Sequence, residues 1–188
     1  NHYTFINNTA TQIGGAIYVR EDSPNCKVRN SYFDNNYITD VHLGIGGAIG
    51  WFGTNGYIYN TTFKNSFAVN GGTLYIGNAS DNMTIVESNF TSSMATGEGG
   101  SIVLYGDNAV INKSNFMYSI GLMRGGTIAA HGASNATIID CNFIKGVGAG
   151  YVDVSNATYG EGGAIFWENA ENLSISNAVF DDIEAHAY

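Results

Sequence analysis

The sequence predicts an all-β protein, folded as a right-handed single-stranded parallel β-helix of about six to seven coils with about 27 residues in each. Two repeated features support this prediction. A Gly-Gly pair followed by a small and an aliphatic residue recurs at residues 14–17, 46–49, 71–74, 99–102, 125–128 and 162–165. A phenylalanine recurs at positions 5, 33, 63, 90, 116, 143 and 180. The right hand is expected because crossovers between parallel strands almost always take it.

The residues before each phenylalanine fix the register of one coil. An aliphatic residue stands five positions earlier, as Val28, Ile58, Ile85, Ile111, Ile138 and Ile175. A small residue stands two positions earlier, as Ser31, Thr61, Ser88, Ser114, Cys141 and Ala178. Short, alternating, β-branched segments bounded by Gly, Asn or Asp are typical of strands. We therefore expect three short strands in each coil.

An asparagine stands eight positions before each phenylalanine, as Asn25, Asn55, Asn82, Asn108, Asn135 and Asn172. Coils of a β-helix stack ~4.8 Å apart, so equivalent positions form ladders. The phenylalanine and aliphatic ladders predict a dry core. The asparagine ladder predicts a left-handed turn whose carboxamides hydrogen-bond along the stack. The Gly-Gly pair predicts a tight corner with positive φ.

The repeat covers residues 1–188, which we interpret as one β-helix segment, a piece of a longer repeat array. Residues 146–161 lengthen one coil by an inserted loop, and a smaller expansion at residues 38–45 falls at the same corner. Insertions in solenoids lie on one face, which is often the binding face. Open coil ends would also permit self-association, because solenoids without polar caps expose their terminal coils.

Charge excludes several classes of partner. The chain has 7 Lys and Arg against 16 Asp and Glu, a formal net charge of −9. Phosphate binding needs clustered Lys and Arg, so we expect no nucleic-acid partner. The same deficit argues against docking on an anionic membrane. No apolar run approaches the ~20 residues of a membrane span, so we expect no direct membrane insertion in this segment.

Two motifs resemble a known family. Phe5-Ile6-Asn7-Asn8 and Phe33-Asp34-Asn35-Asn36, each followed by a Gly-Gly-Ala-Ile segment, resemble the repeats of polymorphic membrane protein passengers. The chain is most similar to adhesin-like surface proteins of methanogenic archaea. This resemblance implies an extracellular, surface-displayed protein that adheres to surface glycans or to cell-surface proteins of another cell. It brings no catalytic residues to carry over, so we expect no enzyme.

Two alternatives remain open. One is a structural stalk, sheath or filament subunit that stacks end to end. The other is a carbohydrate-active β-helix enzyme, a lyase or hydrolase, which needs carboxylates or an acid–base pair on one face. The candidate acidic pair for this alternative is Asp181-Asp182, with Glu184 and His186 nearby. Lys27 and Arg29 share a face, but their neighbours in the ladder are Tyr57 and Tyr59, so we expect no basic cleft there.

Metal and cofactor chemistry have weak support in the sequence. His2, His42, His131 and His186 do not have the spacing of metal ligands, so we interpret them as lone, solvated side chains. We expect no cofactor. Calcium is the one metal retained as an alternative, because turn carboxylates and carbonyls are hard ligands.

The candidate ligand-binding residues are aromatic. If Ile17 faces inward, the next position in each coil faces outward, which exposes Tyr18, Tyr75 and Phe166. Exposed rings are suitable platforms for sugars because one face is apolar and the edge can hydrogen-bond. Tyr57 and Tyr59 form a second outward pair. The inserted loop adds Tyr151, Asp153 and Tyr159.

Two further predictions concern modification and thiols. Asn78 and Asn156 lie in turn-like sequons and are our candidates for N-glycosylation. The sequon asparagines of the ladder should stay unmodified if the ladder is buried. Cys26 and Cys141 lie four coils apart, beyond disulfide reach, so we expect two buried free thiols.

Overall fold

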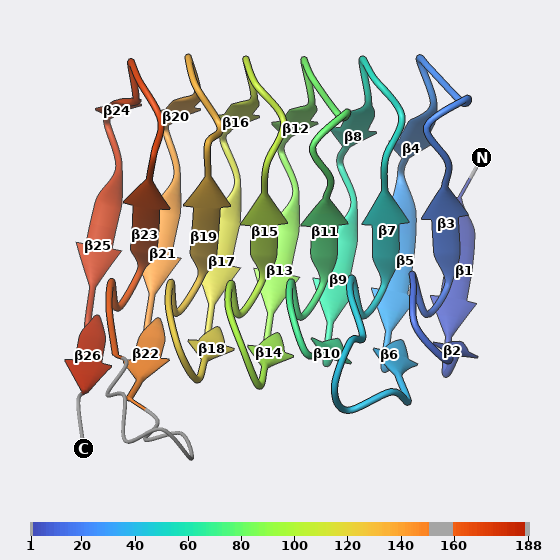
Figure 1. Cartoon of the computed structure of the whole chain (residues 1–188), viewed down its shortest axis with the longest axis horizontal. Helices are drawn as coiled ribbons and strands as arrows, with labels where there is room; N and C mark the ends of the chain where they lie inside the picture. The colour runs from blue at the N-terminus through green and yellow to red at the C-terminus, as the bar shows by residue number, and fades with distance from the viewer. Residues whose placement is uncertain (1, 151–159, 187–188) are drawn as a thin grey trace.

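The computed structural model describes residues 2–150 and 160–186, which form strands and turns with no helix. The strands make four parallel sheets, and each strand pairs with the equivalent strands of the adjacent coils. In Figure 1 the strands on the near face run upward and those behind run downward while the chain advances from right to left, which is the right-handed sense. The predicted fold class is confirmed.

The four sheets are numbered here in the order in which the chain enters them. Sheet 1 contains β1 (Tyr3–Ile6), β5 (Ser31–Asp34), β9 (Thr62–Lys64), β13 (Asn89–Thr91), β17 (Asn115–Met117), β21 (Asn142–Ile144) and β25 (Val179–Asp181). Sheet 2 contains β2 (Thr9–Ala10), β6 (Tyr37–Ile38), β10 (Phe67–Ala68), β14 (Met94–Ala95), β18 (Ile120–Gly121), β22 (Val147–Ala149) and β26 (Glu184–His186). Sheet 3 contains β3 (Ile17–Val19), β7 (Ile49–Trp51), β11 (Leu74–Ile76), β15 (Ile102–Leu104), β19 (Ile128–His131) and β23 (Ile165–Glu168). Sheet 4 contains β4 (Lys27–Arg29), β8 (Tyr57–Tyr59), β12 (Thr84–Val86), β16 (Val110–Asn112), β20 (Thr137–Ile139) and β24 (Ser174–Ser176).

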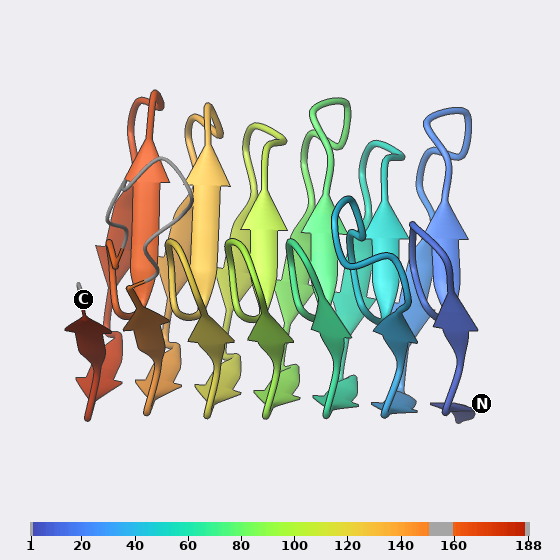
Figure 2. The same cartoon turned by 60° about the horizontal axis from the view of Figure 1, so that its bottom comes forward.

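The expectation of three strands per coil is wrong, because each full coil has four. The additional strands are those of sheet 2, and most of them are only two residues long. Two residues are too few to show the alternation by which a strand is recognised in a sequence. Figure 2 brings sheet 2 forward, with the expanded loop after β6 beside it.

The phenylalanine ladder forms the centre of the core. Phe33, Phe63, Phe90, Phe116 and Phe143 are fully buried. Consecutive rings along the whole ladder, from Phe5 to Phe180, stack with centroids 4.5 to 5.0 Å apart. This is the coil spacing, so ring stacking and sheet pairing favour the same register. The aliphatic ladder of sheet 4 packs against these rings.

The small-residue ladder is polar inside the core, and its groups are satisfied. Ser31, Thr61, Ser88 and Ser114 each donate a hydroxyl hydrogen bond to the carbonyl two residues earlier, at 2.9 to 3.0 Å. The Cys141 thiol makes the equivalent contact with Ile139 O at 3.2 Å. A buried hydroxyl costs little when it is hydrogen-bonded, so this column accepts small polar residues.

The corners have the predicted backbone. The first glycine of each Gly-Gly pair has φ between 58° and 67°, and each ladder asparagine between 55° and 60°. The asparagine carboxamides hydrogen-bond along the stack, as in Asn82 Nδ2 to Asn55 Oδ1 at 2.9 Å. The ladder asparagines are all exposed, in the turn that precedes each strand of sheet 4. We expected the sequon asparagines of this ladder to stay unmodified if they were buried. Because they are exposed, burial does not keep them from N-glycosylation.

One thiol differs from its prediction. Both cysteines are free, and Cys141 is fully buried. Cys26 is only partly buried, because it precedes β4, the terminal strand of sheet 4, and has a neighbouring coil on one side only. The expanded loop at residues 38–45 and the described ends of the inserted loop lie at the same corner, between a strand of sheet 2 and a strand of sheet 3.

Candidate functional site

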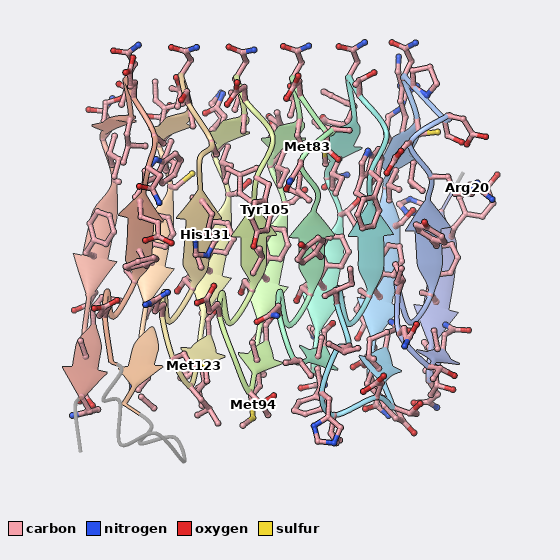
Figure 3. All side chains as sticks on the ribbon, in the orientation of Figure 1. Arg20, Met83, Met94, Tyr105, Met123 and His131 are labelled. Carbon is pink, nitrogen blue, oxygen red and sulfur yellow. The ribbon has the colours of Figure 1, made fainter. Side chains whose placement is uncertain are left out.

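The outward face of sheet 3 carries a continuous row of rings, which we call the aromatic ribbon: Tyr18, Phe52, Tyr75, Tyr105, His131 and Phe166. Successive ring centroids are 5.3 to 5.8 Å apart. Tyr105 and His131 lie next to each other on the near face in Figure 3. The ribbon thus offers one ring per coil over six coils.

The ribbon arises because each coil has two outward positions on sheet 3 and fills one of them with a ring. The register pairs Gly50 with Tyr18 on one side and with Tyr75 on the other, so this column supplies a ring in some coils and a small residue in others. Phe52, two residues after Gly50, supplies the ring of its coil. Gly77 leaves space for that ring, because a Cβ there would lie 2.5 Å from Phe52 Cδ1.

Shallow hollows border the ribbon where sheet 3 turns toward sheet 4. One, of about 310 Å³, is lined by residues that include Phe52, Tyr75 and Asn78. A second, of about 220 Å³, lies beside Tyr18 and Arg20. Sugar-sized groups that contact the rings would therefore also meet polar turn residues.

A network of charged side chains lies at the far end of the ribbon. His131 Nε2 is 2.6 Å from Glu98 Oε2, and His131 Nδ1 is 2.7 Å from Glu168 Oε1. Arg124 pairs with Glu98 at 3.2 Å and with Glu161 at 2.9 Å. The Arg124 guanidinium also lies 5.0 Å from the centroid of Phe166, within cation–π range. The network joins the ribbon to the corner between sheets 2 and 3.

The network sets the protonation of its members. The hydrogen bond to Glu98, together with that to Glu168, raises the pKa of His131 despite its burial. Burial opposes ionisation of Glu98, but the hydrogen bond and charge of His131 and the charge of Arg124 outweigh it and lower the pKa of Glu98. A doubly hydrogen-bonded imidazolium between two carboxylates is the form that satisfies all three groups.

The phenols in the middle of the ribbon stay neutral. Burial raises the pKa of Tyr75, with a further contribution from its neighbour Tyr105. Burial likewise raises the pKa of Tyr105. These rings are therefore uncharged hydrogen-bonding platforms near neutral pH.

The structure divides the predicted ligand-binding residues between two faces. Tyr18, Tyr75 and Phe166 belong to the ribbon on sheet 3. Tyr57 and Tyr59 lie on sheet 4, where their rings stack with centroids 6.1 Å apart. Tyr151, Asp153 and Tyr159 of the inserted loop, and the candidate glycosylation residue Asn156, lie outside the described residues. Asn78 is exposed in a turn beside the ribbon.

Sequence reasoning missed Phe52, Tyr105 and His131. The sequence did contain a sign of them. In the three coils where the position of Tyr18 is occupied by Gly50, Val103 or Ala129, an aromatic residue stands two positions later. The interpretation of His131 as a lone, solvated side chain is wrong, because 13 % of its side chain is exposed and both its nitrogens contact carboxylates.

The acidic residues proposed for the enzyme alternative lie elsewhere. Asp181 is on sheet 1, and Glu184 and His186 pair with each other on sheet 2 at 2.6 Å. Asp182 lies 3.8 Å from Lys145. Within the described residues, no group of three or more His, Cys, Asp or Glu side chains is arranged to hold a metal ion.

Comparison of the chain with protein-family models, curated proteins and solved structures finds no match. Across residues 2–150 and 160–186, no helix has the length and apolar character required to cross a membrane.

Proposed function

We propose that the chain is a non-enzymatic, adhesin-like β-helix that binds extended glycans on the aromatic ribbon and is displayed outside the cell. The observation that carries the proposal is the unbroken row of six rings, one per coil, on one face of a rigid solenoid. Glycan chains present apolar sugar faces at regular intervals, and the separation of adjacent rings is comparable to the length of one pyranose unit. Rigid aromatic platforms also lose little entropy on binding.

The repeat gives the ribbon two properties that suit adhesion. Each ring contributes a weak contact, and several weak contacts in a row add up for a polymer that spans them. The charge network holds the far end of the ribbon in place, because the Arg124 guanidinium packs against Phe166 while pairing with carboxylates. The external location rests on the resemblance to surface adhesins.

One observation favours a second candidate, a glycan-cleaving enzyme. Glu98 and Glu168 flank His131 on the same exposed face as the ribbon. A glycosidase uses one carboxyl group with a raised pKa as the acid and a second as base or nucleophile. The lowered pKa of Glu98 makes it a poor acid, so we place binding before cleavage.

The test is a single incubation of the chain with a panel of neutral and acidic polysaccharides and with whole cells. Retained protein and released sugar products are both measured. We expect retention without products. We also expect Tyr18→Ala and Tyr75→Ala each to weaken retention on the best ligand by roughly tenfold, about 1.4 kcal/mol.

Tyr37→Ala is the matched control, because Tyr37 is a partly exposed ring on sheet 2, away from the ribbon. It should bind like the unmodified chain. Products that disappear in Glu168→Gln would establish the enzyme instead. Neither retention nor products, together with concentration-dependent filaments, would favour the structural subunit.

A further inference from the structure

A second hollow lies on sheet 4, on a different face from the ribbon. It has a volume of about 480 Å³ and is lined by Asn25, Lys27, Arg29, Asn55, Gly56, Tyr57, Asn82 and Thr84. We call it the cationic groove. The sequence-based expectation that no basic cleft forms at Lys27 and Arg29 is wrong, because the turn with the asparagine ladder stands beside these strands and makes the surface concave.

The two cations in the groove are uncompensated. Among the described residues, neither Lys27 nor Arg29 takes part in an ion pair. No strand of sheet 4 contains an acidic residue. The neighbouring acid, Glu87, hydrogen-bonds to Tyr59 and raises the pKa of that phenol. In a chain of net charge −9, this is a local excess of positive charge.

The groups around the cations suit a sugar acid. Arg29 and Lys27 stand on the same outward face of β4, and a guanidinium binds a carboxylate through two parallel hydrogen bonds. The register places Tyr57 beside Lys27 and Tyr59 beside Arg29 in the next coil. Tyr57, whose ring stacks with that of Tyr59, lines the groove and offers an apolar surface next to the positive charge.

The asparagine ladder supplies the remaining wall. Asn55 Nδ2 donates to Asn25 Oδ1 at 3.3 Å, and Asn82 Nδ2 donates to Asn55 Oδ1 at 2.9 Å. A carboxamide nitrogen carries two hydrogens, so each of these donors keeps one N–H for a ligand hydroxyl. The groove therefore combines a carboxylate receptor, a ring platform and hydroxyl donors.

We propose that the cationic groove binds the carboxylate-bearing unit of an acidic glycan, a uronic-acid type of sugar. The carboxylate pairs with Arg29 and Lys27, and the sugar ring lies on Tyr57. This site differs from the ribbon, whose network holds three carboxylates against Arg124 and His131 and so disfavours an acidic sugar. The inference does not depend on glycan binding by the ribbon.

The test is calorimetric titration of the whole chain with a short oligogalacturonate and with its methyl ester, which is the same sugar without charge. We expect the acid to bind and the ester to bind at least about tenfold more weakly. Arg29→Gln and Lys27→Gln should each weaken binding of the acid by roughly the same factor. Added salt should also weaken binding of the acid, because the groove is open to solvent.

Lys113→Gln is the matched control, because it removes one exposed cation that follows β16 on sheet 4, away from the groove. It should bind the acid as the unmodified chain does, and so should Tyr75→Ala in the ribbon. The proposal is overturned if the acid does not bind, if the ester binds equally well, or if Arg29→Gln has no effect. Equal binding of a sulfated oligosaccharide would overturn the selectivity for a carboxylate.

Discussion

Replacement of Phe116 by alanine probes the stacked core. Phe116 is fully buried and stacks on Phe90 at 4.7 Å and on Phe143 at 5.0 Å. Truncating a buried phenylalanine costs about 3–5 kcal/mol, and the two lost ring pairs place this position in the upper half of that range, at about 4 kcal/mol. For a chain of this length, the melting temperature should fall by about 8–16 °C.

Phe180→Ala provides the matched control in the same ladder. Phe180 is 46 % exposed and, among the described residues, stacks only on Phe143, so its truncation should cost about 1–2 kcal/mol. The measurement is urea unfolding followed by tryptophan fluorescence and circular dichroism, since the chain has two tryptophans. Equal losses for the two variants, or a loss below about 1 kcal/mol for Phe116→Ala, would refute the reasoning about ladder packing.

Three further predictions concern the backbone, the thiols and the charge network. Gly126→Ala should prevent native folding, because its Cβ would lie 2.0 Å from Gly163 O. In Gly132→Ala the nearest atom to the added Cβ is Asn169 O at 4.0 Å, so this variant should lose only about 1 kcal/mol for its positive φ. Circular dichroism and thermal melts compare the two variants. Cys26 should react with a thiol reagent faster than Cys141, because burial both shields the Cys141 thiol and raises its pKa. Comparable rates for the two thiols would contradict the register that buries Cys141 in the core. The pKa of His131 is raised in the fold, so the protonated imidazole stabilises the folded state fully below about pH 6.5, the ordinary pKa of histidine. This stabilisation is lost as pH rises from that value through the raised pKa. His131→Gln should therefore flatten the dependence of melting temperature on pH over this range.

The fold was predictable because a solenoid repeats its core in the sequence. Phe5 and Phe33 pair directly in sheet 1, and Ile58 and Ile85 pair in sheet 4, so the spacing of equivalent residues is the register of the sheets. The short strands of sheet 2 escaped prediction because two residues do not reveal an alternating pattern. The core was therefore more predictable than the number of strands.

The candidate sites were less predictable because they depend on outward side chains. His131 contacts Glu168, its register partner in the next coil, and Glu98, which lies 33 residues earlier at a corner, in the column of Arg124 and Glu161. No single ladder contains all three. The hydrogen bond between His131 and Glu98 joins two ladders, and a comparison within one ladder does not reveal it.

The cationic groove was missed for a related reason. Lys27 and Arg29 were compared only with their neighbours along the ladder, Tyr57 and Tyr59. The concavity comes from the adjacent turn, where Asn25 and Asn55 stand beside the strand. The hollow is formed by a turn and a strand that follow each other in one coil. A comparison of equivalent positions in successive coils does not show how they fold around it.

The most direct test of the central claim is the dependence of affinity on glycan length, measured by titrating the chain with oligosaccharides of increasing length prepared from its best polysaccharide ligand. The account predicts that affinity rises with each added sugar until the ligand spans the six rings of the ribbon, and then levels off. Tyr18→Ala, at one end of the ribbon, should weaken the long oligosaccharides by more than the short ones. An affinity that is already complete with a disaccharide, or a uniform effect of Tyr18→Ala at every length, would contradict the account.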